Sequence, residues 1–140
     1  MNFYLDTNIL MSFIFIDAQT TAVETWIGKH EVSLCVGDWV EAEFVSIVNK
    51  RIRARAMSAA DGASGMADFD AFVGQRARRL PISPAAGARA ASLARDPRLK
   101  LSAADALHLA CASEGGYCLV TGDARLIEAA RASGVPVEQP

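Results

Sequence analysis

The sequence predicts an α/β domain in which a parallel sheet carries helices on both faces. Two observations predict this class. Short apolar segments alternate along the whole chain with segments of helical character, and the chain shows neither an internal repeat nor a low-complexity tail. Its 140 residues are 51% hydrophobic, which suffices for one core. We therefore expect a single domain over residues 1–140.

The strands are expected where an apolar, β-prone run is bounded by polar or glycine-containing residues. The last of these runs contains Pro136, which a strand tolerates only at the edge of a sheet. The expected extended segments cover residues 3–5, 32–36, 80–82, 117–121 and 135–137.

Helices are expected between these strands, with boundaries set by capping residues. Ser83 and Ser102 each precede a helical segment. Asp38 is expected to be an N-cap, with Glu41 completing a capping box. Residues 59–65 are small and contain glycine, which predicts a turn between two helices. The expected helices cover residues 9–16, 20–29, 38 onward, 68–79, 84–95, 102–113 and 123–132.

Composition excludes several classes of protein. Three cysteines without regular spacing argue against a disulfide framework and favour a reduced, cytoplasmic setting. The apolar stretch over residues 9–16 is too short to cross a bilayer, so no membrane association is expected. The chain has no GxxxxGK[ST] loop and no GxSxG elbow, which excludes the usual nucleoside-triphosphatases and serine hydrolases.

Charge is distributed unevenly along the chain. The formal net charge is -2, but residues 50–100 carry +7 and the remaining residues carry -9. This division suggests an anionic polymer as the partner of the basic segment and cations as the partners of the acidic remainder. The alternative is a solvated surface on which the charges happen to segregate.

Four acidic residues are candidates for one site. Ligand sites in parallel sheets form beyond the carboxyl ends of the strands. Asp6 and Asp123 follow expected strands, and Glu43 and Asp105 lie near the starts of helices that should point to the same edge. Gathered carboxylates repel one another, and a hard divalent cation such as Mg²⁺ relieves this repulsion. One or two such ions can activate water against a phosphodiester.

Each acid also has an ordinary structural explanation. Glu43 falls within the apolar arc of its helix, where a metal ion or an arginine would compensate its charge. Asp105 fits a capping box, Asp123 fits the N-cap of the last helix, and Asp6 fits an Asx-turn. His108 lies three residues after Asp105, which leaves open a hydrogen bond to that carboxylate or ordinary packing in the core.

The segments around these acids resemble the four motifs of PIN-domain ribonucleases, and among them most closely the VapC toxins of type II toxin–antitoxin pairs. The segments are residues 4–10 (YLDTNIL), 41–44 (EAEF), 104–110 (ADALHLA) and 120–126 (VTGDARL).

The resemblance implies a three-layer α/β/α fold and Mg²⁺- or Mn²⁺-dependent endoribonuclease activity. It also implies inhibition by a cognate antitoxin and frequent homodimerisation. The family's acidic, metal-binding and catalytic positions are matched by Asp6, Glu43, Asp105 and Asp123. Its supporting polar positions are matched by Asn8 and Thr121.

We therefore expect a toxin that hydrolyses RNA at a site of four carboxylates. A basic segment either binds RNA or is a solvated helix face, and it consists of Lys50, Arg51, Arg53 and Arg55. Two alternatives stay open. One is a phosphatase or phosphotransferase with Asp6 as nucleophile, which Asn8 weakens because that chemistry expects a second acid there. The other is a non-catalytic binding module whose acids are caps and ion pairs.

Overall fold

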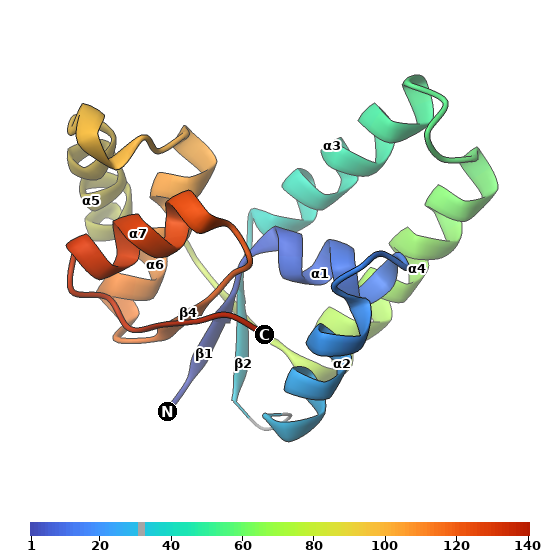
Figure 1. The fold of residues 1–140 in the computed structure, drawn as a ribbon, viewed down its shortest axis with the longest axis horizontal. Helices are drawn as coiled ribbons and strands as arrows, with labels where there is room; N and C mark the ends of the chain where they lie inside the picture. The colour runs from blue at the N-terminus through green and yellow to red at the C-terminus, as the bar shows by residue number, and fades with distance from the viewer. Residues whose placement is uncertain (31–32) are drawn as a thin grey trace.

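The structure, a computed structural model that describes residues 1–30 and 33–140, has a five-stranded sheet between two layers of helices (Figure 1). The strand order is β3-β2-β1-β4-β5, and every neighbouring pair is parallel. The strands are β1 (Phe3–Leu5), β2 (Leu34–Gly37), β3 (Arg78–Leu80), β4 (Cys118–Val120) and β5 (Val137–Glu138). The predicted three-layer α/β/α class is therefore confirmed.

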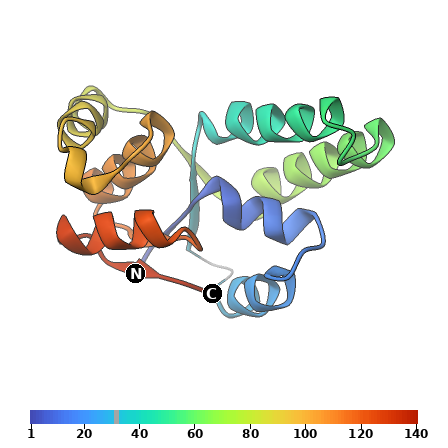
Figure 2. The same ribbon diagram turned by 45° about the horizontal axis from the view of Figure 1, so that its top comes forward.

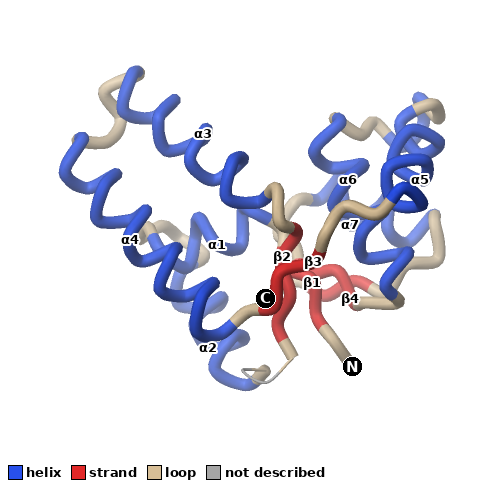
Figure 3. The backbone as a smooth tube through the Cα atoms, turned by 180° about the vertical axis from the view of Figure 1, so that it is seen from behind, coloured by secondary structure: helices blue, strands red, loops and turns tan. Residues whose placement is uncertain are grey.

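Four helices cover one face of the sheet and three cover the other, as Figures 2 and 3 show from two further directions. The first layer contains α1 (Thr7–Ile14), α2 (Thr20–Lys29), α3 (Val40–Arg53) and α4 (Ala59–Arg76). The second contains α5 (Pro84–Ala94), α6 (Ala103–Gly115) and α7 (Ala124–Ala132), with a short 3₁₀ turn, η1 (Pro97–Leu99), between α5 and α6.

The side chains of β1 alternate between two separate hydrophobic cores. Phe3 and Leu5 pack among residues of α1–α4, whereas Tyr4 packs among residues of α5–α7. This alternation follows from the two-residue period of a strand. Within the described residues, no helix is both long enough and apolar enough to cross a membrane.

Most of the expected elements begin and end within two residues of their predicted bounds. The hydroxyl of Ser83 accepts a hydrogen bond from the Ala86 N–H at 3.0 Å, and that of Ser102 accepts one from the Asp105 N–H at 3.2 Å. Gly116 ends α6 with a φ of 67°, a conformation that glycine adopts without strain. Strand β5 lies at the edge of the sheet, as Pro136 predicts. The first residue of the expected strand 32–36 lies outside the described residues.

The predicted N-cap at Asp38 is wrong. Helix α3 begins at Val40, and Trp39 is its N-cap without a side-chain hydrogen bond. The Asp38 N–H instead donates to the carbonyl of Leu80 at 2.8 Å, which ties the end of β2 to β3. Glu41 pairs with Arg79 at 3.1 Å rather than closing a capping box. A partner distant in sequence therefore replaces the local cap in both cases.

The predicted turn over residues 59–65 is also wrong, because this segment is the first part of α4. Ser58 caps the helix by accepting a hydrogen bond from the Asp61 N–H at 3.0 Å. A Cβ atom at Gly62 would lie 2.6 Å from the Ile52 side chain, and one at Gly65 would collide with the Phe15 ring. These glycines let helices approach closely and do not bend the chain.

The predicted end of the helix expected over residues 68–79 is wrong, because the observed helix ends earlier. Helix α4 ends at Arg76, and residues 78–80 form β3, slightly before the extended segment expected at 80–82. Pairing with β2, in which Arg78 lies opposite Cys35, determines this boundary.

Gly65→Ala and Gly74→Ala test this explanation of α4. Gly65→Ala should lower the free energy of unfolding by about 1–3 kcal/mol, because the added methyl group overpacks the contact with Phe15. Gly74 is exposed in the same helix and a methyl group there meets nothing within 4 Å. Gly74→Ala should therefore stabilise the protein by about 0.5–1 kcal/mol. Urea unfolding measures both, and equal effects would contradict the packing role of Gly65.

Candidate metal centre

Asp6 comes directly after β1 and is buried, with 2% of its surface exposed. Its side chain makes no capping hydrogen bond to α1, so neither an Asx-turn nor a cap explains it. The hydroxyl of Thr121 instead donates to Asp6 Oδ2 at 2.7 Å. Thr121 directly follows β4, the neighbour of β1 in the sheet. The adjacent strand end therefore orients this carboxylate.

His108 joins Asp6 to Glu43. The Nε2 atom of this buried histidine on α6 lies 3.2 Å from Asp6 Oδ1 and 3.0 Å from Glu43 Oε1. The sequence left open a hydrogen bond between His108 and Asp105, and the structure places the imidazole against these other two carboxylates instead. It also shows that the neighbour of Glu43 is a histidine rather than an arginine.

Tyr4 holds the other side of the imidazole. Its hydroxyl lies 3.2 Å from His108 Nδ1, and Trp39 packs on the imidazole with a centroid distance of 4.3 Å. Burial raises the pKa of Tyr4, as do the nearby charges of Asp6 and Glu43, so the phenol keeps its proton. A phenol can both donate and accept, so this hydroxyl holds Nδ1 in place whether the imidazole is neutral or protonated.

Glu43 is held in its ionised form. Burial alone would raise the pKa of Glu43, but hydrogen bonds from His108 and Thr7 and the charge of His108 together lower it below the ordinary value. A carboxylate on the apolar face of α3 is thus compensated by hydrogen bonds from α6 and α1.

Asp105 shares the electrostatic environment of Asp6 and Asp123. Burial raises the pKa of Asp105, and the charges of Asp6 and Asp123 raise it further against the opposing hydrogen bond from Ser102. The predicted capping by Ser102 is real, but it does not remove the electrostatic cost of this carboxylate. A nearby cation would do so.

Asp123 is the N-cap of α7, as one of the structural explanations predicts. Its Oδ1 accepts hydrogen bonds from the N–H groups of Arg125 at 2.8 Å and Leu126 at 3.3 Å. Its own N–H donates to the Thr121 hydroxyl at 3.1 Å, so Thr121 connects Asp123 to Asp6. Asn8, exposed at the start of α1, lines one hollow of about 260 Å³ together with Asp123.

The donor atoms fit a divalent cation. Asp6, Glu43 and His108 each offer one ligand atom, and these atoms lie within 4.8 Å of one another. Asp105 and Asp123 lie outside this tight group. The ion pairs Arg79–Glu41 and Arg98–Asp96 involve none of the four candidate acids. Carboxylate oxygens suit Mg²⁺ and Mn²⁺, and an imidazole nitrogen suits several transition metals.

The basic segment predicted to contact RNA lies away from these acids. Lys50, Arg51 and Arg53 belong to the last turn of α3, and Arg55 follows it. Ten residues of helix separate Glu43 from Arg53, which corresponds to about 15 Å along the axis. The segment therefore lies at the far end of the arm that α3 and α4 form in Figure 1.

Comparisons with known proteins identify the family and the fold of this chain. The PIN domain family model matches residues 3–132. A DNA-bound VapBC structure from Salmonella typhimurium has a TM-score of 0.76 at 17% identity, covering 99% of this chain and 98% of that chain. VapC20 from Mycobacterium tuberculosis, described as a sarcin-ricin loop cleaving toxin, has a TM-score of 0.75 at 17% identity, covering 99% and 100%.

A third solved structure, VapBC2 from Rickettsia felis bound to a fragment of its promoter DNA, has a TM-score of 0.71 at 19% identity, covering 99% of this chain and 98% of that chain. At such low identities the similarity shows a shared fold. No curated protein matches the sequence.

Thr121→Val tests the orientation of Asp6. The substitution keeps the shape of the side chain but removes the donor to a buried carboxylate, so the free energy of unfolding should fall by about 1–3 kcal/mol. Thr25→Val is the control, because the hydroxyl of Thr25 is exposed and bonds only within α2. Chemical denaturation should show a change below about 0.5 kcal/mol for the control. Equal losses would contradict the role of Thr121.

Asp105→Asn tests the electrostatic cost at the site. Asp105 has a higher pKa in the folded protein than its ordinary 3.8, so its ionisation removes stability as the pH rises through the raised pKa. Above that range, metal-free Asp105→Asn should exceed the wild type in stability by at most about 1 kcal/mol, since solvent screens a half-exposed group. The gain should shrink toward pH 4. Asp70→Asn, at an exposed position, is the control. Denaturation at several pH values measures both, and a less stable Asp105→Asn at pH 7 would contradict the prediction.

Proposed function

This chain belongs to the PIN domain family, and from that premise we propose that it is a metal-dependent endoribonuclease, the toxin of a toxin–antitoxin pair. One observation carries the proposal. Asp6 and Glu43, from separate motifs, meet at His108 beside the two acids of the remaining motifs. The substrate class is RNA, and the proposed partners are a cognate antitoxin and a second copy of the chain.

In this proposal Asp6, Glu43, Asp105 and Asp123 hold one or two Mg²⁺ or Mn²⁺ ions, directly or through water. Such an ion, when bound, polarises water toward the scissile phosphate and stabilises charge on the leaving oxygen. Glu43 stays ionised and aimed by its contact with His108, and Thr121 fixes Asp6.

The remaining residues support binding in this scheme. Asn8 is exposed and lines the same hollow as Asp123, which supports the proposal that its side-chain amide donates to a phosphate oxygen or to water. An outer contact with the RNA strand is assigned to the basic end of α3, which comprises Lys50, Arg51, Arg53 and Arg55. The three cysteines are buried and unpaired, which supports a cytoplasmic location.

The two alternative functions have less support. A phosphotransferase needs an accessible nucleophile, whereas Asp6 is 2% exposed and both of its carboxylate oxygens face donors. A binding module whose acids are caps and ion pairs explains Asp123, which caps α7, and Asp105, whose N–H donates to the capping hydroxyl of Ser102. It does not explain Asp6, which is buried and makes no capping hydrogen bond.

Glu43→Gln and Glu41→Gln form a matched pair that tests the proposal. Glu43→Gln, like Asp6→Asn, should reduce Mn²⁺-supported RNA cleavage by at least about 100-fold, since a ligand charge is lost. Glu41 lies on the same helix but pairs with Arg79 at the surface, so its substitution should change the rate less than about twofold. Cleavage of total RNA, with ends mapped and EDTA as a further control, measures these rates. Wild-type cleavage by Glu43→Gln would falsify the assigned role.

A further inference from the structure

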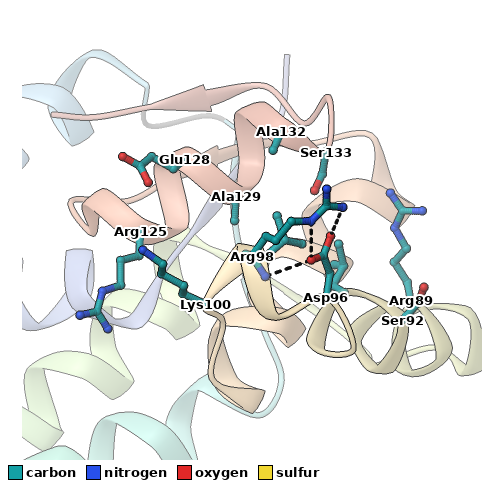
Figure 4. A pocket seen from close by; sticks show the side chains of 12 residues that line it. Arg89, Ser92, Asp96, Arg98, Lys100, Arg125, Glu128, Ala129, Ala132 and Ser133 are labelled. Atoms are coloured by element: carbon teal, nitrogen blue, oxygen red, sulfur yellow. Dashed lines mark hydrogen bonds and ion pairs between the residues drawn. The ribbon is translucent and has the colours of Figure 1, made fainter.

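A groove of about 760 Å³ lies between α7 on one side and the C-terminal half of α5 with the segment that connects α5 to α6 on the other (Figure 4). Four cationic side chains and two acidic ones line it. The cations are Arg89, Arg98, Lys100 and Arg125, and the acids are Asp96 and Glu128. Leu93 and Leu99 are its only large apolar lining residues within the described structure, so the groove lacks the apolar centre typical of a protein interface.

Arg98 is fixed in position by Asp96. Its Nε and Nη2 atoms donate to the two carboxylate oxygens at 3.0 and 2.9 Å, and its backbone N–H donates to the same carboxylate at 3.0 Å. The Arg98 side chain is nevertheless 87% exposed, so its remaining N–H groups face solvent. A guanidinium held in this way is preorganised for an oxyanion.

The other three cations have no acidic partner within the described residues. Arg89 has a buried Nε atom that donates no hydrogen bond to any described group, and the oxygen of a ligand would satisfy it. Lys100 has a φ of 55°, a conformation that non-glycine residues adopt only where the surrounding structure imposes it. With four cations against two acids, the lining of the groove therefore carries an excess of positive charge.

Two cations of the groove lie close in sequence to residues of the carboxylate site. Arg125 lies in the first turn of α7, two residues after Asp123, and Lys100 lies two residues before Ser102, the cap of the helix that carries Asp105. Figure 4 shows Arg125 at the start of α7, and Arg89 and Arg98 toward its end near Ser133. A strand with one phosphate at the carboxylates would thus have its next phosphates along this row.

We propose that the groove binds the phosphate backbone of the RNA strand beside the cleaved bond. This inference rests on the proposed ribonuclease function and assigns its substrate contact to residues outside the four acids. A row of separate cations matches the repeated charge of a polynucleotide, whereas a small anion needs only one of them.

Binding of a fluorescein-labelled 12-nucleotide single-stranded RNA in EDTA tests the groove without cleavage. Anisotropy titrations between 50 and 200 mM KCl give both the Kd and its salt dependence. Arg89→Gln and Arg125→Gln should each weaken binding several-fold and reduce the slope of log Kd against log salt by about 0.7, and the double variant by about 1.4.

Arg95→Gln and Arg131→Gln are the matched controls. They remove the same charge from exposed positions outside the groove, Arg95 at the C-cap of α5 and Arg131 in α7. Both should bind RNA within twofold of the wild type. Groove variants that fold normally by circular dichroism and bind like these controls would overturn the inference, and so would equal binding of a labelled polyglutamate 12-mer at the groove.

Cleavage assays separate this inference from the proposed function. Groove variants should raise KM more than they lower kcat. If the wild type cleaves RNA but the groove variants bind like the controls, the groove assignment fails and the ribonuclease stands. If the groove variants lose RNA binding but the wild type cleaves no RNA with any divalent metal, the groove stands and the ribonuclease fails.

Discussion

Repulsion among carboxylates at the carboxyl edge of the sheet is the constraint on which the site depends. Asp6 and Glu43 lie against one imidazole nitrogen, at 3.2 and 3.0 Å, and the field of Asp6 and Asp123 reaches Asp105. Two side chains hold this arrangement. The imidazole of His108, itself held by the Tyr4 hydroxyl, contacts Asp6 and Glu43, and the hydroxyl of Thr121 donates to Asp6. These contacts use only part of the acceptor capacity of the carboxylate oxygens, and the remaining lone pairs can bind a cation.

The acids could be located from sequence because their signals are local. Asp6 and Asp123 follow apolar strands, and the carboxyl ends of parallel strands must meet at one edge. Their hydrogen-bond partners could not be located in this way. His108 lies 65 residues from Glu43 and 102 from Asp6, and its signal, one histidine on the buried face of α6, is equally typical of core packing.

The errors in the fold arise where long-range contacts override local rules. Gly62 and Gly65 favour a turn when the sequence is considered locally. Both nevertheless lie within α4, where the absence of a side chain lets α3 and Phe15 pack closely against them. Asp38 carries a capping signal, yet its N–H bonds to Leu80 and the helix begins at Val40. In each case the partner lies on an element whose position no local pattern specifies.

The basic residues of the chain lie in separate clusters of the folded structure, and these clusters differ in their distance from the acids. The basic end of α3 lies about 15 Å along the helix axis from Glu43, beyond the Debye length of about 8 Å at physiological salt, so screening weakens its pull on a phosphate at the acids. Arg79 on β3 is already paired with Glu41. Lys100 and Arg125 flank the helices that carry Asp105 and Asp123. Compared with Arg79 and the basic end of α3, Lys100 and Arg125 are therefore better placed to offset the repulsion between the acidic site and an anionic polymer.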